Sequence, residues 1–198
     1  MTDCSGCKIC SCYRGEDCVR GHNFESYGEP TQREYGKTEN KKIMEVSTRI
    51  EGEHYMEWTR IEEIIGFARR MGYKRIGIAH CAGLTNEAKT LRDILKKNFE
   101  VHAVCCKFSG VDKKKFDLVQ IKEERYEAIC NSIGQAMVLN DLKTDLNITV
   151  GLCVGHDILF TQNSVAPVTT FIVKDRVTGH NPVATLYSNY YKKKFGVE

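Results

Sequence analysis

The sequence lacks several features that would point to a familiar class of protein. No apolar run reaches the roughly 18 residues that a membrane-spanning helix needs, so we expect no membrane partner. The 198 residues carry 29 basic and 26 acidic side chains, and this near balance gives no clear sign of a nucleic-acid partner. Neither a G-x-G-x-x-G or Walker loop nor a G-x-S-x-G turn is present. The first residues lack the charged and apolar regions of a signal peptide, so we expect a cytoplasmic protein.

One residue type is abundant, since the chain contains ten cysteines. In a reducing cytoplasm, so many cysteines are more often metal ligands or redox groups than disulfides. Half of them lie within the first 18 residues. This uneven distribution favours a metal site in that segment over a framework of five bridges.

The N-terminal cysteines have the spacing of metal ligands. Residues 1–25 show no apolar periodicity, so the segment needs cross-links to become ordered. A C-x-x-C pair places two thiolates on one ion, and four thiolates suit zinc or an iron–sulfur cluster such as [4Fe–4S]. The alternative is a set of free or cross-linked surface thiols. We expect the metal ligands to be Cys4, Cys7, Cys12 and Cys18.

The remaining chain divides into a connecting part and a larger domain. Residues 26–55 are predicted to be a linker and a helix, because the polar stretch 26–40 contains Gly28, Pro30 and Gly36. Residues 56–198 alternate helical and strand patterns. Thr59 and Glu62 form a capping-box pattern before an apolar stripe. The predicted strands are 75–80, 99–106, 148–153 and 168–174.

This alternation predicts an α/β domain with a mostly parallel sheet and helices on both faces. In such sheets, ligands bind beyond the carboxyl ends of the strands. Four cysteines from four segments map to that edge, which predicts a second, thiol-lined site that binds a cofactor. The alternative for each cysteine is a small buried side chain. Its expected residues are Cys81, Cys106, Cys130 and Cys153, and Cys105 is expected to point to the other face of its strand.

Two further residues could move protons at this edge. His156 follows Cys153 closely, and Glu87 lies in the first turn of the helix after Cys81. Both are candidate catalytic residues. A histidine of this kind is also often a hydrogen-bonded polar group without a catalytic role, and Glu87 could simply complement the helix dipole.

Several segments together resemble the prokaryotic family called domain of unknown function 1847, which is described as predicted metal-binding. The resemblance extends over nearly the whole chain and includes the pattern C-x2-C-x4-C-x5-C at the N-terminus, to which Cys10 is an addition. It implies metal binding and a bacterial or archaeal cytoplasm, and it supplies no reaction. The segments that carry it are residues 76–84, 106–107, 130–136, 151–157 and 173–182.

We therefore expect a cytoplasmic metal-binding protein, with an iron–sulfur cluster favoured over zinc. Its strand-end thiols could act on a small molecule. One alternative is a zinc-stabilised module that binds a ligand or a protein without catalysis. Another is a thiol oxidoreductase that uses Cys81 or Cys153 and requires a resolving thiol. Whether the protein is an enzyme, and its oligomeric state, are left open by the sequence.

Overall fold

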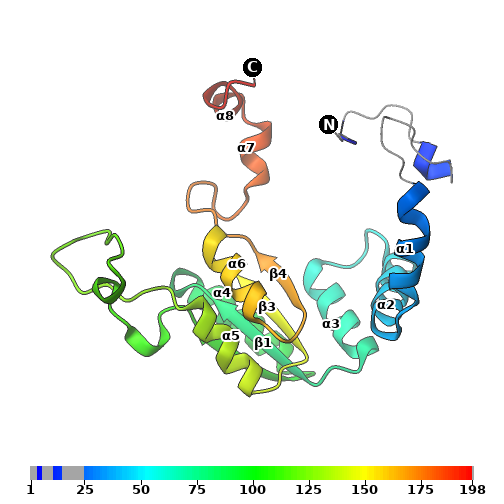
Figure 1. The fold of residues 1–198 in the computed structure, drawn as a ribbon, viewed down its shortest axis with the longest axis horizontal. Coiled ribbons are helices and arrows are strands. Elements are labelled where there is room, and N and C mark those ends of the chain that lie inside the picture. The colour runs from blue at the N-terminus through cyan, green and yellow to red at the C-terminus, as the bar shows by residue number, and fades with distance from the viewer. Residues whose placement is uncertain (1–3, 6–10, 15–24, 198) are drawn as a thin grey trace. The chain divides into compact units, whose positions relative to one another are not determined.

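The computed structural model describes residues 4–5, 11–14 and 25–197 (Figure 1). The chain forms two compact units, Met1–Glu57 and Trp58–Glu198. Among the described helices, none combines the length and the apolar character needed to cross a membrane.

The first unit is helical where it is described. It contains the 3-10 turn Ser11–Arg14, helix α1 over Glu25–Gly36 and helix α2 over Thr38–His54. The loop predicted for residues 26–40 is therefore wrong. Gly28 and Pro30 suggested a loop, but α1 forms across them because the residues that follow them include good helix formers. Ion pairs along the helix, such as Arg33–Glu29, stabilise it further.

The second unit is built on four parallel strands (Figure 1). They are β1 (Arg75–His80), β2 (Glu100–Cys105), β3 (Leu146–Val150) and β4 (Val168–Ile172), in the spatial order β2-β1-β3-β4. The order reverses between β1 and β3, since the chain moves first to one side of β1 and then to the other. The crevice at such a reversal is where ligands bind in open parallel sheets.

Helices cover both faces of this sheet, as the sequence predicts. Helices α3 (Arg60–Met71) and α4 (Thr85–Leu95) pack with Ile76, Ile78 and Ile148 on one face. Helices α5 (Ser132–Asp141) and α6 (Val154–Asn163) pack on the other through Leu139 and Phe160. Alternation along the strands explains this division, because Ile76 and Ile78 face one side while Gly77 and Ala79 face the other.

The start of α3 follows the predicted capping box. The Thr59 hydroxyl accepts a hydrogen bond from the backbone N–H of Glu62, and the Glu62 carboxylate accepts one from the backbone N–H of Thr59. Gly72 ends the helix with a φ of +81°. The remaining short elements follow the strands and the C-terminal part. They are the 3-10 turns Ala82–Leu84, Phe108–Gly110 and Lys113–Phe116, and the helices α7 (Val183–Tyr187) and α8 (Asn189–Lys194).

The third strand is shorter than predicted. β3 ends at Val150, and Gly151 takes a φ of +66° that turns the chain out of the sheet. Cys153 is consequently the N-cap residue of α6 rather than the last residue of a strand. A side chain at position 151 would also meet Leu84, because an added Cβ would lie 1.9 Å from Leu84 Cδ1. Glycine is thus required at the mouth of β3.

Candidate functional site

Two of the predicted thiols touch at the end of β2. Cys106 follows that strand and is 2% exposed, whereas Cys130 is half-buried and lies two residues before α5. The backbone N–H of Asn131 donates to the carbonyl oxygen of Cys106 at 2.8 Å, which brings the two segments together. The two thiols interact closely enough for each to shift the pKa of the other.

The surroundings of the two thiols shift their pKa values in opposite directions. The neighbouring thiol of Cys106 stabilises the Cys130 thiolate, and with the positive charge of Lys107 it lowers the pKa of Cys130 to about 5. The same contact, together with burial, raises the pKa of Cys106 well above its usual value. The negative charge belongs on Cys130 because this sulfur is the more exposed of the two and lies closer to cations. At neutral pH the pair is one thiolate with one thiol beside it.

Two cationic side chains stand beside Cys130. Lys107 favours the Cys130 thiolate by its charge and donates a hydrogen bond to the carbonyl oxygen of Ala128. His156, half-buried in the first turn of α6, also lowers the pKa of Cys130 electrostatically. The structure therefore brings His156 to the thiol site, in keeping with its predicted position.

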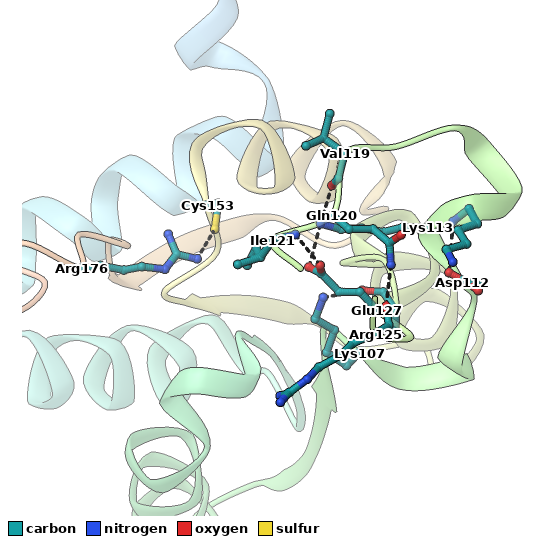
Figure 2. A network of polar contacts seen from close by, with 12 residues as sticks. Lys107, Asp112, Lys113, Val119, Gln120, Ile121, Arg125, Glu127, Cys153 and Arg176 are labelled. Carbon is teal, nitrogen blue, oxygen red and sulfur yellow. Dashed lines mark hydrogen bonds and ion pairs between the residues drawn. The ribbon is translucent and has the colours of Figure 1, made fainter. Parts of the chain in front are cut away.

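Cys81 and Cys153 lie at the mouths of β1 and β3. The N–H of Cys81 donates to the carbonyl oxygen of Val150 at 3.0 Å, so the two strand ends are joined there. Cys81 also acts electrostatically on Cys106. The sulfur of Cys153 accepts a hydrogen bond of 3.3 Å from the guanidinium of Arg176 (Figure 2). All four predicted cysteines thus belong to one edge of the sheet.

The sequence analysis missed two basic residues at this edge, both in the segment after β4. The Arg176 guanidinium interacts electrostatically with Cys81 and Cys130 as well as with Cys153, and these thiols raise the pKa of Arg176. The Lys174 ammonium lies 3.7 Å from the point where a Cβ of Gly83 would stand. The cysteine pattern gave no signal for either, since both approach the site only through the folding of the chain.

A charged loop borders the thiol pair. Glu127 accepts hydrogen bonds from Lys113 at 2.7 Å and from the backbone N–H of Ile121 at 2.7 Å, and Lys113 also donates to the carbonyl oxygen of Val119 (Figure 2). Lys113 is the main reason why the pKa of Glu127 is below its usual value, and Lys107 adds to the effect. The ion pair therefore holds residues 113–127 together next to Lys107.

The other predicted residues are not brought to this site by any contact that the structure describes. Glu87 is exposed in the first turn of α4, and its catalytic role stays a prediction. Cys4 and Cys12 are exposed, while Cys7 and Cys18 lie outside the described residues. Within the described ranges, no three His, Cys, Asp or Glu side chains are arranged to hold a metal ion.

Comparison with known proteins gives two matches. The family model "Protein of unknown function (DUF1847)" matches residues 19–171. An uncharacterized protein of Methanocaldococcus jannaschii is 54% identical over 194 residues, which cover 96% of each chain. No solved structure gives a significant match.

Proposed function

The chain belongs to the DUF1847 family, and starting from that membership we propose that its strand-end thiols carry out sulfur chemistry on a small molecule. Cys130 is the attacking thiolate and Cys106 is the resolving thiol. As part of the same proposal the protein works in a reducing cytoplasm, where low-molecular-weight thiols reduce the Cys106–Cys130 disulfide again after each turnover.

The observation that carries this proposal is the pairing of Cys106 with Cys130, whose segments are joined by the 2.8 Å hydrogen bond from the N–H of Asn131 to the carbonyl oxygen of Cys106 and whose thiols shift each other's pKa. A low-pKa thiolate beside a second thiol is the arrangement required for thiol–disulfide exchange. In the sequence no C-x-x-C pair lies at a strand end. Here two distant segments supply the pair instead, and the thiolate is Cys130 rather than Cys81 or Cys153.

The proposed reaction balances in two steps. The Cys130 thiolate attacks one sulfur of a small-molecule disulfide, forms a mixed disulfide and releases the first half of the substrate as a thiolate, which takes the proton from Cys106. The Cys106 thiolate then attacks the Cys130 sulfur and releases the second half. The substrate gains two electrons, and the protein gains a Cys106–Cys130 disulfide.

Reaction with 5,5′-dithiobis(2-nitrobenzoate) tests the order of these steps. In the reduced protein, we expect Cys130 to react first and the product to be a Cys106–Cys130 disulfide without bound thionitrobenzoate. In Cys106→Ser, which lacks the resolving thiol, the mixed disulfide should remain on Cys130. Peptide mass spectrometry identifies both products.

Cys105→Ser is the matched control, because Cys105 is the neighbour of Cys106 on the chain and is only half-buried. It should behave like the unaltered protein. An unmodified Cys130, or a mixed disulfide that persists while Cys106 is present, would contradict the proposal.

Metal binding is a second candidate function, and the close spacing of the N-terminal cysteines in the sequence favours it. Thiolates are the preferred ligands of zinc and iron–sulfur clusters. We propose the N-terminal Cys4, Cys7, Cys12 and Cys18 as ligands of one metal centre. If zinc is structural there, the strand-end site acts independently of it, as a catalytic or a ligand-binding site.

A further inference from the structure

The strand-end site contains more basic side chains than the two that lie beside the Cys106–Cys130 pair. Lys107 and His156 stand beside Cys130, but Lys174 and Arg176 come from a different segment, the one that follows β4. Their positions at the reversal of strand order suggest a ligand rather than a structural role.

Lys174 places a positive charge without a hydrogen-bonding partner at this reversal of strand order. Its ammonium lies 3.7 Å and 3.8 Å from the points where Cβ atoms of Gly83 and Gly151 would stand, so it lies between the mouths of β1 and β3. The side chain is half-buried. In the part of the chain that the structure describes, it makes no hydrogen bond or ion pair. A partly desolvated cation without a partner favours an anion.

The turn after Lys174 is held by its own hydrogen bonds. The carboxylate of Asp175 accepts from the N–H groups of Val177 and Thr178 at 2.9 and 3.0 Å, and the N–H of His180 donates to the carbonyl oxygen of Asp175 at 2.7 Å. Asp175, the acidic residue next to Lys174 in the sequence, therefore bonds the backbone of its own turn rather than the Lys174 ammonium. The same turn presents Arg176 to Cys153.

Gly83 lies next to both the ammonium of Lys174 and the thiol of Cys81. An added Cβ at Gly83 would lie 3.7 Å from Lys174 Nζ and 3.9 Å from Cys81 Sγ. The absence of a side chain at position 83 keeps the ammonium and the thiol accessible to the same small group.

We infer that this edge of the sheet binds the oxyanion group, a carboxylate or a phosphate, of the small molecule on which the thiols act, and that Lys174 and Arg176 hold it. The inference rests on the proposed thiol function for its reaction and adds the class of substrate. Arg176 offers paired N–H donors to an oxyanion, and Lys174 offers a point charge. The bound group lies beside the thiols, so an attached electrophilic sulfur is within their reach.

Two alkylating reagents of nearly equal size test the inference. Iodoacetate carries a carboxylate, and iodoacetamide is its neutral counterpart. In the reduced protein we expect the iodoacetate rate to saturate with concentration and to be slowed by inorganic phosphate more than by chloride at equal ionic strength. Iodoacetamide should show neither effect. Mass spectrometry assigns each rate to a cysteine.

The variants Lys174→Met and Arg176→Gln separate anion binding from thiolate stabilisation. Each should slow iodoacetate by about tenfold or more, the factor expected for losing a charge-assisted hydrogen bond. The iodoacetamide rate at Cys130 should stay within about twofold at pH 8, well above the pKa of about 5 of this thiol. The control is Lys97→Met, which removes an exposed charge just before β2, at the opposite edge of the sheet.

Two results would overturn the inference. If both reagents slow equally in the variants, the two cations only stabilise thiolates. If the unaltered protein shows no saturation by iodoacetate and no competition by phosphate, this edge of the sheet binds no oxyanion. A carboxylate preference at Cys81 or Cys153, with Cys130 unreactive, would instead support the oxyanion site and contradict the proposed role of Cys130.

Discussion

The N–H of Asn131 donates a hydrogen bond of 2.8 Å to the carbonyl oxygen of Cys106. This one contact places Cys130 beside Cys106, although 23 residues lie between the two cysteines in the chain. Asn131 is also the N-cap of α5, and its side chain accepts from the N–H of Gly134 at 3.0 Å. The thiol pair is therefore anchored to the start of a helix and to the end of a strand.

The reactivity of Cys130 should depend on pH in a way that free cysteine does not. With a pKa of about 5, its alkylation by iodoacetamide should be half-maximal near pH 5 and constant above about pH 6.5. Lys107→Met removes a positive charge and a hydrogen bond, so it should shift the midpoint upward. Rates measured by mass spectrometry from pH 4 to 9 check this, and a midpoint above about 7.5 in the unaltered protein would contradict it.

The same ionisation links pH to stability. The pKa of Cys130 is lower in the folded protein than the ordinary 9.0 of the unfolded chain, so the folded state holds fewer protons between these values. The contribution of Cys130 to the free energy of unfolding should thus be full above pH 9 and fall as the pH drops toward 5. Denaturant unfolding of Cys130→Ser should lack this part of the pH dependence. Equal pH profiles for the two proteins would contradict the assignment of the thiolate.

Gly151 should tolerate no side chain. Gly151→Ala combines a φ of +66° with a Cβ that would lie 1.9 Å from Leu84 Cδ1, so we expect a loss of roughly 2 to 5 kcal/mol in the free energy of unfolding. Gly155, in the first turn of α6, has nothing within 4 Å of its added Cβ. Gly155→Ala should instead stabilise the helix by up to about 1 kcal/mol. Equal effects of the two substitutions in urea unfolding would contradict this account.

Glu127 should order the loop that borders the site. Glu127→Ala removes the acceptor for Lys113 and for the N–H of Ile121. We expect the amide of Ile121 to exchange with solvent about tenfold faster or more, because a half-buried ion pair and a backbone hydrogen bond are lost together. Glu124→Ala, at an exposed position of the same loop, is the control and should leave the exchange unchanged.

Metal content should separate the two groups of cysteines. After anaerobic purification we expect iron and sulfide for a cluster, or about one zinc per chain for a structural site. A double variant of Cys4 and Cys7 should then lose the N-terminal metal, whereas a double variant of Cys106 and Cys153 should retain it. A colourless protein without iron after anaerobic reconstitution would exclude the cluster, and one also without zinc would exclude both.

The local elements were largely determined by the sequence. The strand Arg75–His80, the capping box of Thr59 and Glu62, and the end of α3 at Gly72 all agree with the structure. These features depend on neighbouring residues, namely apolar periodicity, a cap three residues from its partner and a glycine with positive φ. The α/β class followed from their alternation. Helix α1 was missed because Gly28 and Pro30 are only local indicators of a loop.

The composition of the site was decided by the tertiary structure. The sequence predicted that the cysteines would reach one edge, since parallel strands end there, but not that Cys106 would pair with Cys130. It also gave no reason to select Lys174 or Arg176, whose positions depend on the turn held by Asp175. A sequence pattern fixes which strand end a residue follows. Which side chains meet there, and so which thiol carries the charge, depends on contacts between segments that only the folded chain brings together.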